Sequence, residues 1–152
     1  MRQLIIIVIV FMMTSCGSQK NMVKETKTSE ISIFQQWKLE SIRGEYLDIN
    51  ALSKEPQITF DKSENRFFGN DGCNSFSGSF KSEGNKIILG PIMATKMACM
   101  NMLIPNKYNQ ALSKVASFNL KQLKGEDRQK ENYQLQLLDQ NSSVILQFVK
   151  AE

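Results

Sequence analysis

Two segments decide the fold of this chain: Gly69-Asn70-Asp71-Gly72-Cys73-Asn74-Ser75-Phe76-Ser77-Gly78-Ser79-Phe80, and, after a short turn and strand, Met93-Ala94-Thr95-Lys96-Met97-Ala98-Cys99. Asn70-Asp71-Gly72 is typical of a turn, because Asn, Asp and Gly tolerate positive φ. Aromatic residues and serines alternate after it, which predicts a strand with Phe76, Gly78 and Phe80 on one face. Residues 92–99 are expected to be extended.

Alternation of apolar and polar residues predicts further short strands on both sides. They are expected near residues 37–40, 58–61, 66–69, 86–89, 118–120, 133–137 and 144–148. A helix is expected at 105–117, where Tyr108, Ala111, Leu112 and Val115 share one face. The sequence therefore predicts an α+β, mostly β fold: a curled antiparallel sheet, or small barrel, of about eight short strands with one packed helix.

The N-terminus has the features of a bacterial lipoprotein signal. A short positive start, Met1-Arg2-Gln3, precedes an apolar run at residues 4–13, and small residues then lead to Cys16. The run is too short to span a bilayer core of about 30 Å as a helix. We predict a signal peptide at 1–15 and lipidation of Cys16. The alternative is plain secretion with a free Cys16.

The rest of the chain divides into a tether and one domain. Residues 16–33 are mostly polar and lack apolar periodicity, which predicts a flexible tether. Residues 34–152 are long enough for a single domain with its own core. Lipidation would anchor this domain in the cell envelope, and we expect it at the outer membrane, facing the periplasm.

Composition removes several functional classes. The net charge is +4 with scattered lysines, which indicates a solvated surface rather than a nucleic-acid site. The chain contains no histidine, which excludes Ser-His-Asp and Cys-His nucleophiles and His-containing zinc sites. Carboxylates and lysines remain available for catalysis. We expect no enzymatic activity, no cofactor and no metal site.

Two groups of residues have both a functional and a structural interpretation. A polar pocket could be lined by Asn74, Ser75, Ser77 and Thr95, but such residues more often satisfy backbone groups in turns and at sheet edges. Thioethers favour Cu(I), whereas methionine more often fills irregular cores, which is the favoured interpretation. The methionines concerned are Met93, Met97, Met100 and Met102.

The two deciding segments resemble the META domain family. The resemblance is carried by Gly72-Cys73-Asn74, by Ser77-Gly78-Ser79, by Thr95-Lys96-Met97-Ala98-Cys99 and by an early tryptophan, Trp37. It covers about residues 37–148 and gives a structural role to these motif positions: Trp37, Gly72, Asn74, Gly78, Thr95 and Met97.

The family resemblance implies a function only in outline. Members are mostly envelope or secreted proteins, often lipoproteins, and the same domain occurs in the heat-shock protein HslJ, which is linked to heat stress and novobiocin tolerance. No catalytic residue or agreed ligand comes with the family. We therefore predict a non-enzymatic envelope lipoprotein that acts in stress response or antibiotic tolerance through protein or envelope partners. The alternative is a small-ligand carrier with a cavity in the curled sheet, and the oligomeric state is left open.

The remaining cysteines are expected to form a disulfide. With Cys16 as the lipid site, Cys73 and Cys99 are left at the two ends of the deciding stretch. Disulfides persist outside the cytoplasm. The alternative is two buried free thiols that act as small apolar side chains.

Overall fold

A computed structural model describes residues 32–48, 52–123 and 132–151. The chain divides into two units, Met1–Glu30 and Ile31–Glu152, and the described residues all lie in the second. The predicted signal peptide, the lipidation site Cys16 and nearly all of the predicted tether lie outside the described residues.

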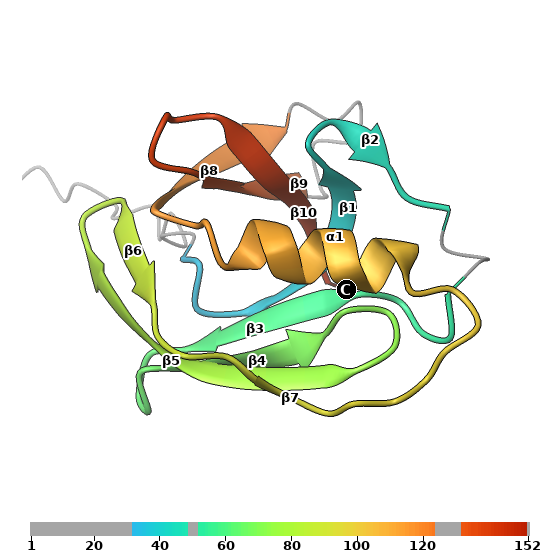
Figure 1. The fold of residues 1–152 in the computed structure, drawn as a ribbon. Helices are drawn as coiled ribbons and strands as arrows, with labels where there is room; N and C mark the ends of the chain where they lie inside the picture. The colour runs from blue at the N-terminus through green and yellow to red at the C-terminus, as the bar shows by residue number, and fades with distance from the viewer. Residues whose placement is uncertain (1–31, 49–51, 124–131, 152) are drawn as a thin grey trace, which may run out of the picture. The chain divides into compact units, whose positions relative to one another are not determined.

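The described residues form ten strands and one helix (Figure 1). In chain order they are β1 (Gln36–Ile42), β2 (Glu45–Tyr46), β3 (Gln57–Asp61), β4 (Arg66–Asn70), β5 (Ser75–Glu83), β6 (Lys86–Leu89), β7 (Met93–Ala94), α1 (Leu103–Leu112), β8 (Ser117–Leu123), β9 (Asn132–Leu138) and β10 (Val144–Lys150).

All strands join one antiparallel sheet. Its order is β10-β9-β8-β6-β5-β4-β3-β1-β2, and β7 pairs with β5. β10 also pairs with β1, so the sheet curls until strands from the two ends of the domain meet (Figure 1). The prediction of a mostly β, curled antiparallel sheet with one helix is confirmed. The structure has ten strands rather than about eight. Two of them, β2 and β7, are only two residues long, which is too short for alternation in the sequence to predict them.

Large apolar side chains fill the inner face of the curled sheet. Along β5, Phe76, Gly78 and Phe80 are buried, as the alternation predicts, whereas Ser75 and Ser79 are exposed. The largest fully buried side chains are Trp37, Tyr108, Phe60, Phe67, Phe148, Ile58, Ile87, Leu112, Leu135, Leu137, Ile145 and Leu146. Several buried aromatic rings contact one another; the centroids of Phe60 and Phe80, for example, lie 5.4 Å apart.

Helix α1 packs against β1 and β10 with its apolar face (Figure 1). That face includes Tyr108, Ala111 and Leu112, as predicted. The predicted bounds were wrong, because the helix begins at Leu103 and ends at Leu112. It ends early because the chain then joins the sheet, where the Ala116 N–H donates to the Leu138 carbonyl at 2.8 Å. No helix among the described residues is long and apolar enough to cross a bilayer.

The last strand departs from simple alternation. Val144 is exposed, whereas Ile145 and Leu146 are both buried. The register passes from Val144 opposite Leu138 to Leu146 opposite Leu137, so Ile145 is the extra residue of a β-bulge. A bulge bends the strand and re-aims the side chains around it. That change of direction explains why two successive residues point into the core.

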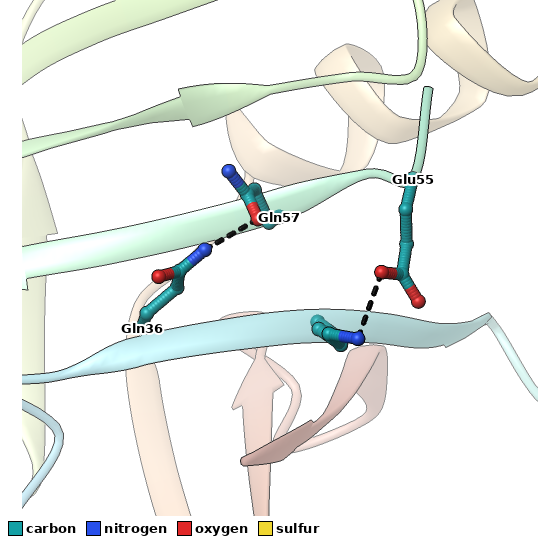
Figure 2. A network of polar contacts seen from close by, with 4 residues as sticks. Gln36, Glu55 and Gln57 are labelled. Atoms are coloured by element: carbon teal, nitrogen blue, oxygen red, sulfur yellow. Dashed lines mark hydrogen bonds and ion pairs between the residues drawn. The ribbon is translucent and has the colours of Figure 1, made fainter. Parts of the chain in front are cut away.

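The outer face of β1 carries polar side chains that pair with Gln57 of β3 and with Glu55, which lies two residues before β3 (Figure 2). The Gln36 amide donates to the Gln57 side-chain oxygen. Lys38 Nζ lies 2.9 Å from Glu55 Oε2, and both side chains are more than one third exposed. Exposed ion pairs contribute only about 0–1 kcal/mol. This face is therefore a solvated surface, and the inner face supplies the packing that holds the sheet.

Candidate functional site

The turn between β4 and β5 is built around the carboxylate of Asp71. This side chain is 0% exposed, which is unusual for a charged residue. Its Oδ1 accepts the backbone N–H groups of Cys73 at 2.9 Å and of Asn74 at 2.6 Å. The N–H of Asp71 donates to the Asn74 carbonyl at 3.0 Å. The buried carboxylate thus supplies the acceptor that the backbone of its own turn requires.

The second oxygen of this carboxylate ties the turn to the helix. Asp71 Oδ2 accepts Asn109 Nδ2 of α1 at 2.7 Å. The neighbouring helical residue, Tyr108, is fully buried. Burial first, and the charge of Asp71 second, raise the pKa of Tyr108 well above its usual value. The phenol therefore stays protonated and neutral at physiological pH.

Asn74 and Thr95 join the turn to the segment that follows β7. Asn74 Oδ1 accepts the Met97 N–H at 2.7 Å and the Thr95 hydroxyl at 3.1 Å. The Ser75 N–H donates to Thr95 Oγ1 at 3.1 Å, and the Thr95 N–H donates to the Ser75 carbonyl at 3.0 Å. Asn74 Oδ1 and Thr95 Oγ1 are thus engaged in internal hydrogen bonds, which favours the structural interpretation of these residues over a polar pocket.

A disulfide closes the same region. Cys73 and Cys99 are bonded to each other, with their Cα atoms 6.1 Å apart and a sequence separation of 26. The structure therefore holds a disulfide here rather than two free thiols. Three parts of the chain meet here: the turn between β4 and β5, the segment that follows β7, and α1. We call the residues that join them the signature cluster: Asp71, Cys73, Asn74, Thr95, Cys99 and Asn109.

Steric constraints explain why two motif positions, Gly72 and Gly78, are glycine. Gly72 has a φ of +96°, a conformation that L side chains rarely adopt. At Gly78 an added Cβ would lie 2.7 Å from ring atoms of Phe67, so the ring rests directly on the backbone of β5.

The other two motif residues, Trp37 and Met97, also have structural roles. Trp37 belongs to the core of β1, where its indole Nε1 donates to the Ile33 carbonyl at 2.9 Å. Met97 contributes its backbone to the signature cluster, whereas its side chain is exposed.

The reactive groups of this region are engaged in holding the fold. The carboxylate of Asp71 has three N–H donors, and both sulfurs of the signature cluster are in the disulfide. In the part of the chain that the structure describes, no group of three or more His, Cys, Asp or Glu residues could hold a metal ion. Side chains fill the inner face of the sheet, so no observation favours the ligand-carrier alternative.

Sequence reasoning missed the parts played by Asp71 and Asn109. Asp71 was interpreted only as a turn residue, although an Asx turn is the local signal that its side chain can bond the backbone two residues on. Asn109 lies 38 residues away and carries no such signal. Only the packing of α1 against the turn brings its amide to the carboxylate.

Comparisons with known proteins give a family and a fold. The META domain family model matches residues 31–152. No curated protein matches the chain. An NMR structure of a protein from Burkholderia xenovorans is similar at a TM-score of 0.57 and 20% identity, covering 78% of this chain and 83% of that one. Another NMR structure is similar at 0.52 and 20%, covering 76% and 88%. At such identities these likenesses show the fold alone.

Proposed function

Since this chain belongs to the META domain family, we propose that it is a non-enzymatic lipoprotein of the cell envelope that acts through its surface. One observation carries the proposal: the residues of the signature cluster are used to hold three parts of the chain together. The potentially reactive groups of this cluster, the Asp71 carboxylate and the sulfurs of Cys73 and Cys99, are already bonded inside the domain. We therefore expect the protein to act by binding partners through its outer surface.

The N-terminal sequence supports an envelope location. Cys16 follows a short apolar run and two small residues, the arrangement of a lipidation signal. Each buried acyl CH₂ contributes roughly 0.8 kcal/mol, so several chains give lasting attachment. A flexible tether of about 15 residues has a root-mean-square length of roughly 20 Å. Partners would therefore be proteins or other envelope components close to the membrane surface, and we place the protein at the outer membrane, facing the periplasm.

Replacing Cys16 with alanine should abolish lipidation. Wild-type protein grown with a clickable fatty acid should carry the label and remain in the membrane fraction after a carbonate wash, whereas Cys16→Ala should carry none. The Cys73→Ala, Cys99→Ala double variant is the matched control, because it loses two cysteines but keeps Cys16 and should still be labelled. Label retained in Cys16→Ala would show that the anchor lies elsewhere.

The proposed role in stress or antibiotic tolerance predicts a phenotype that depends on the anchor. Cells without the protein should be more sensitive to heat or to novobiocin, and the wild-type chain should restore tolerance. Cys16→Ala should restore it poorly, because the domain would no longer be held beside its partners. Crosslinking in intact envelopes followed by purification should capture those partners. Normal tolerance in the deletion strain under both conditions would contradict this role.

A further inference from the structure

The methionines of β7 and of the segment that follows it lie mostly in solvent. The relative exposure is 66% for Met93, 57% for Met97 and 109% for Met100, whereas Met102 is half-buried. The expectation that these side chains fill the core is therefore wrong for three of the four. Met93 belongs to a strand, so the pairing of the strands shows which side chains lie around it.

Met93 shares the outer face of the sheet with two other exposed apolar side chains. Ser77 of β5 lies opposite both Met93 of β7 and Phe68 of β4. Further along β5, Lys81 lies opposite Ile88 of β6. Side chains directly opposite each other, and those two or four residues apart on one strand, project from the same face. Phe68, Ile88 and Met93 therefore project from one face.

The side chains that separate these three apolar groups are small. On β5 they are Ser77 and Ser79, whereas Phe68 is 47% exposed and Ile88 is 67% exposed. The outer face of β1 differs, because the side chains that pair there are polar. Exposed apolar residues that gather on one face mark an interaction surface, whereas scattered ones need no explanation.

The same face is basic. Three cations and one carboxylate project from it in the strand registers: Arg66, Lys81, Lys86 and Glu83. At its margins, Asp61 lies opposite Arg66, and Lys54 Nζ lies 3.4 Å from Ser75 Oγ. The four cations and two carboxylates give these positions a net charge of +2. We call this surface the basic face and define it by Arg66, Phe68, Lys81, Lys86, Ile88 and Met93.

We propose that the basic face binds the surface of an anionic phospholipid bilayer. Phe68, Ile88 and Met93 enter the boundary between head groups and acyl chains, and the basic side chains lie beside lipid phosphates. The inference rests on the proposed lipid anchor, which holds the domain next to a bilayer. Binding of the face is then effectively intramolecular, so a modest affinity is enough to keep it on the membrane.

Charge favours this occupant over a second copy of the chain. A twofold contact places the same patch of both copies together, so the basic face would meet its own cations. Like charges brought together across an interface are unfavourable. An anionic bilayer supplies the opposite charge and an apolar layer together, which matches both components of the face.

The test uses the mature lipidated chain on the outside of preformed vesicles. The vesicles contain phosphatidylcholine alone, or phosphatidylcholine with anionic phosphatidylglycerol. A fluorophore is attached at Ser79→Cys, an exposed position within the basic face, or at Asn119→Cys, an exposed position on β8. Access of the neutral quencher acrylamide to the Ser79 position should fall about threefold on the anionic vesicles, because the face lies on the lipid surface. Access to the Asn119 position should not change.

Attachment and docking have separate measurements. Flotation with the neutral vesicles reports the lipid anchor, because the basic face finds no anionic surface there. A chain that does not float with them lacks the anchor, which would overturn the proposed function and this inference with it. A chain that floats with both kinds of vesicle but remains equally accessible at the Ser79 position would overturn the docking proposal alone.

Matched variants test the two components of the face. Arg66→Glu with Lys81→Glu should restore quencher access on the anionic vesicles, and so should Ile88→Ser with Met93→Ser. Their melting temperatures should match that of the parent, because all but Arg66 were chosen for exposed apolar or basic side chains and Arg66 is itself exposed.

The control reverses the same number of charges elsewhere. Lys114 and Lys121 are exposed and lie after α1 and on β8, so Lys114→Glu with Lys121→Glu should remain protected from the quencher. Protection that survives Arg66→Glu with Lys81→Glu, or that is equal at the Asn119 position, would overturn the proposal. Protection that appears in detergent and rises with protein concentration would also overturn it, because another protein molecule would then cover the face.

Discussion

Replacing Asp71 with alanine should lower the free energy of unfolding by about 3–5 kcal/mol, because a buried donor left unsatisfied costs roughly 1–3 kcal/mol. The substitution removes the acceptor of three donors. Two are the backbone N–H groups of Cys73 and Asn74, and the third is the side-chain amide of Asn109. The turn is buried, so bulk water cannot readily replace the carboxylate. Urea denaturation should show a lower midpoint with an unchanged slope.

Graded variants test whether the hydrogen bonds are responsible. Asp71→Asn should cost less, about 1–2 kcal/mol, because its amide oxygen still accepts both backbone N–H groups. The amide of Asn109 can rotate to present its own oxygen to the new amide. Asn109→Ala removes one bond and should cost a similar amount. A loss in Asp71→Asn as large as that in Asp71→Ala would assign the effect to charge instead.

Asp61, the last residue of β3, offers a matched control because its side chain holds the turn between β3 and β4. Its Oδ1 accepts the N–H groups of Ser63 at 2.8 Å and of Glu64 at 3.3 Å, a local pattern like that of Asp71. The hydroxyl and N–H of Ser63 lower the pKa of Asp61. This carboxylate is open to solvent, so water can take over its bonds. Asp61→Ala should therefore lose only a small part of what Asp71→Ala loses, and equal losses would contradict the role of burial.

The sequence predicts those parts of the fold that depend on local periodicity. Phe76 and Phe80 alternate with serines, and this fixes the buried face of β5 whatever strand lies beside it. The apolar face of α1 follows in the same way from the spacing of Tyr108 and Leu112. The bulge at Ile145 does not, because it arises from the register between β9 and β10. The end of α1 likewise depends on where the chain joins the sheet.

The candidate site likewise combines residues that local sequence reveals with contacts that depend on the tertiary fold. Cys73, Asn74 and Thr95 stand in motifs that the sequence displays, but the contact of Asp71 with Asn109 requires the tertiary fold. The exposure of the methionines was missed for a related reason. Methionine usually packs in cores. In this chain, however, the Met97 N–H donates to Asn74 Oδ1, and the Met97 side chain is left in solvent. A hydrogen bond to a distant turn cannot be read from the local sequence.

Removing the disulfide should lower the free energy of unfolding by about 3.5 kcal/mol in the chain-entropy model, for a loop of the present length. The bond between Cys73 and Cys99 closes a segment with a sequence separation of 26. Without it the unfolded chain gains freedom, whereas the native chain keeps the bonds of Asn74 to Met97 and Thr95. The Cys73→Ala, Cys99→Ala variant should therefore stay folded at low temperature and unfold at lower urea concentration. Parent protein treated with a reductant should match it.

Thiol labelling provides the direct chemical test of that bond. In a Cys16→Ala background, denatured but unreduced protein should take up no thiol reagent, and reduced protein should take up two equivalents. Asp71 and Asn109 supply the internal comparison, because the hydrogen bond between their side chains joins the turn to α1 without involving sulfur. Reduction should loosen the segment 95–101 while amide protection in the Asp71 turn persists. Uptake of two equivalents before reduction would mean that the thiols are free. The segment would then be held by Asn74 and Thr95 alone.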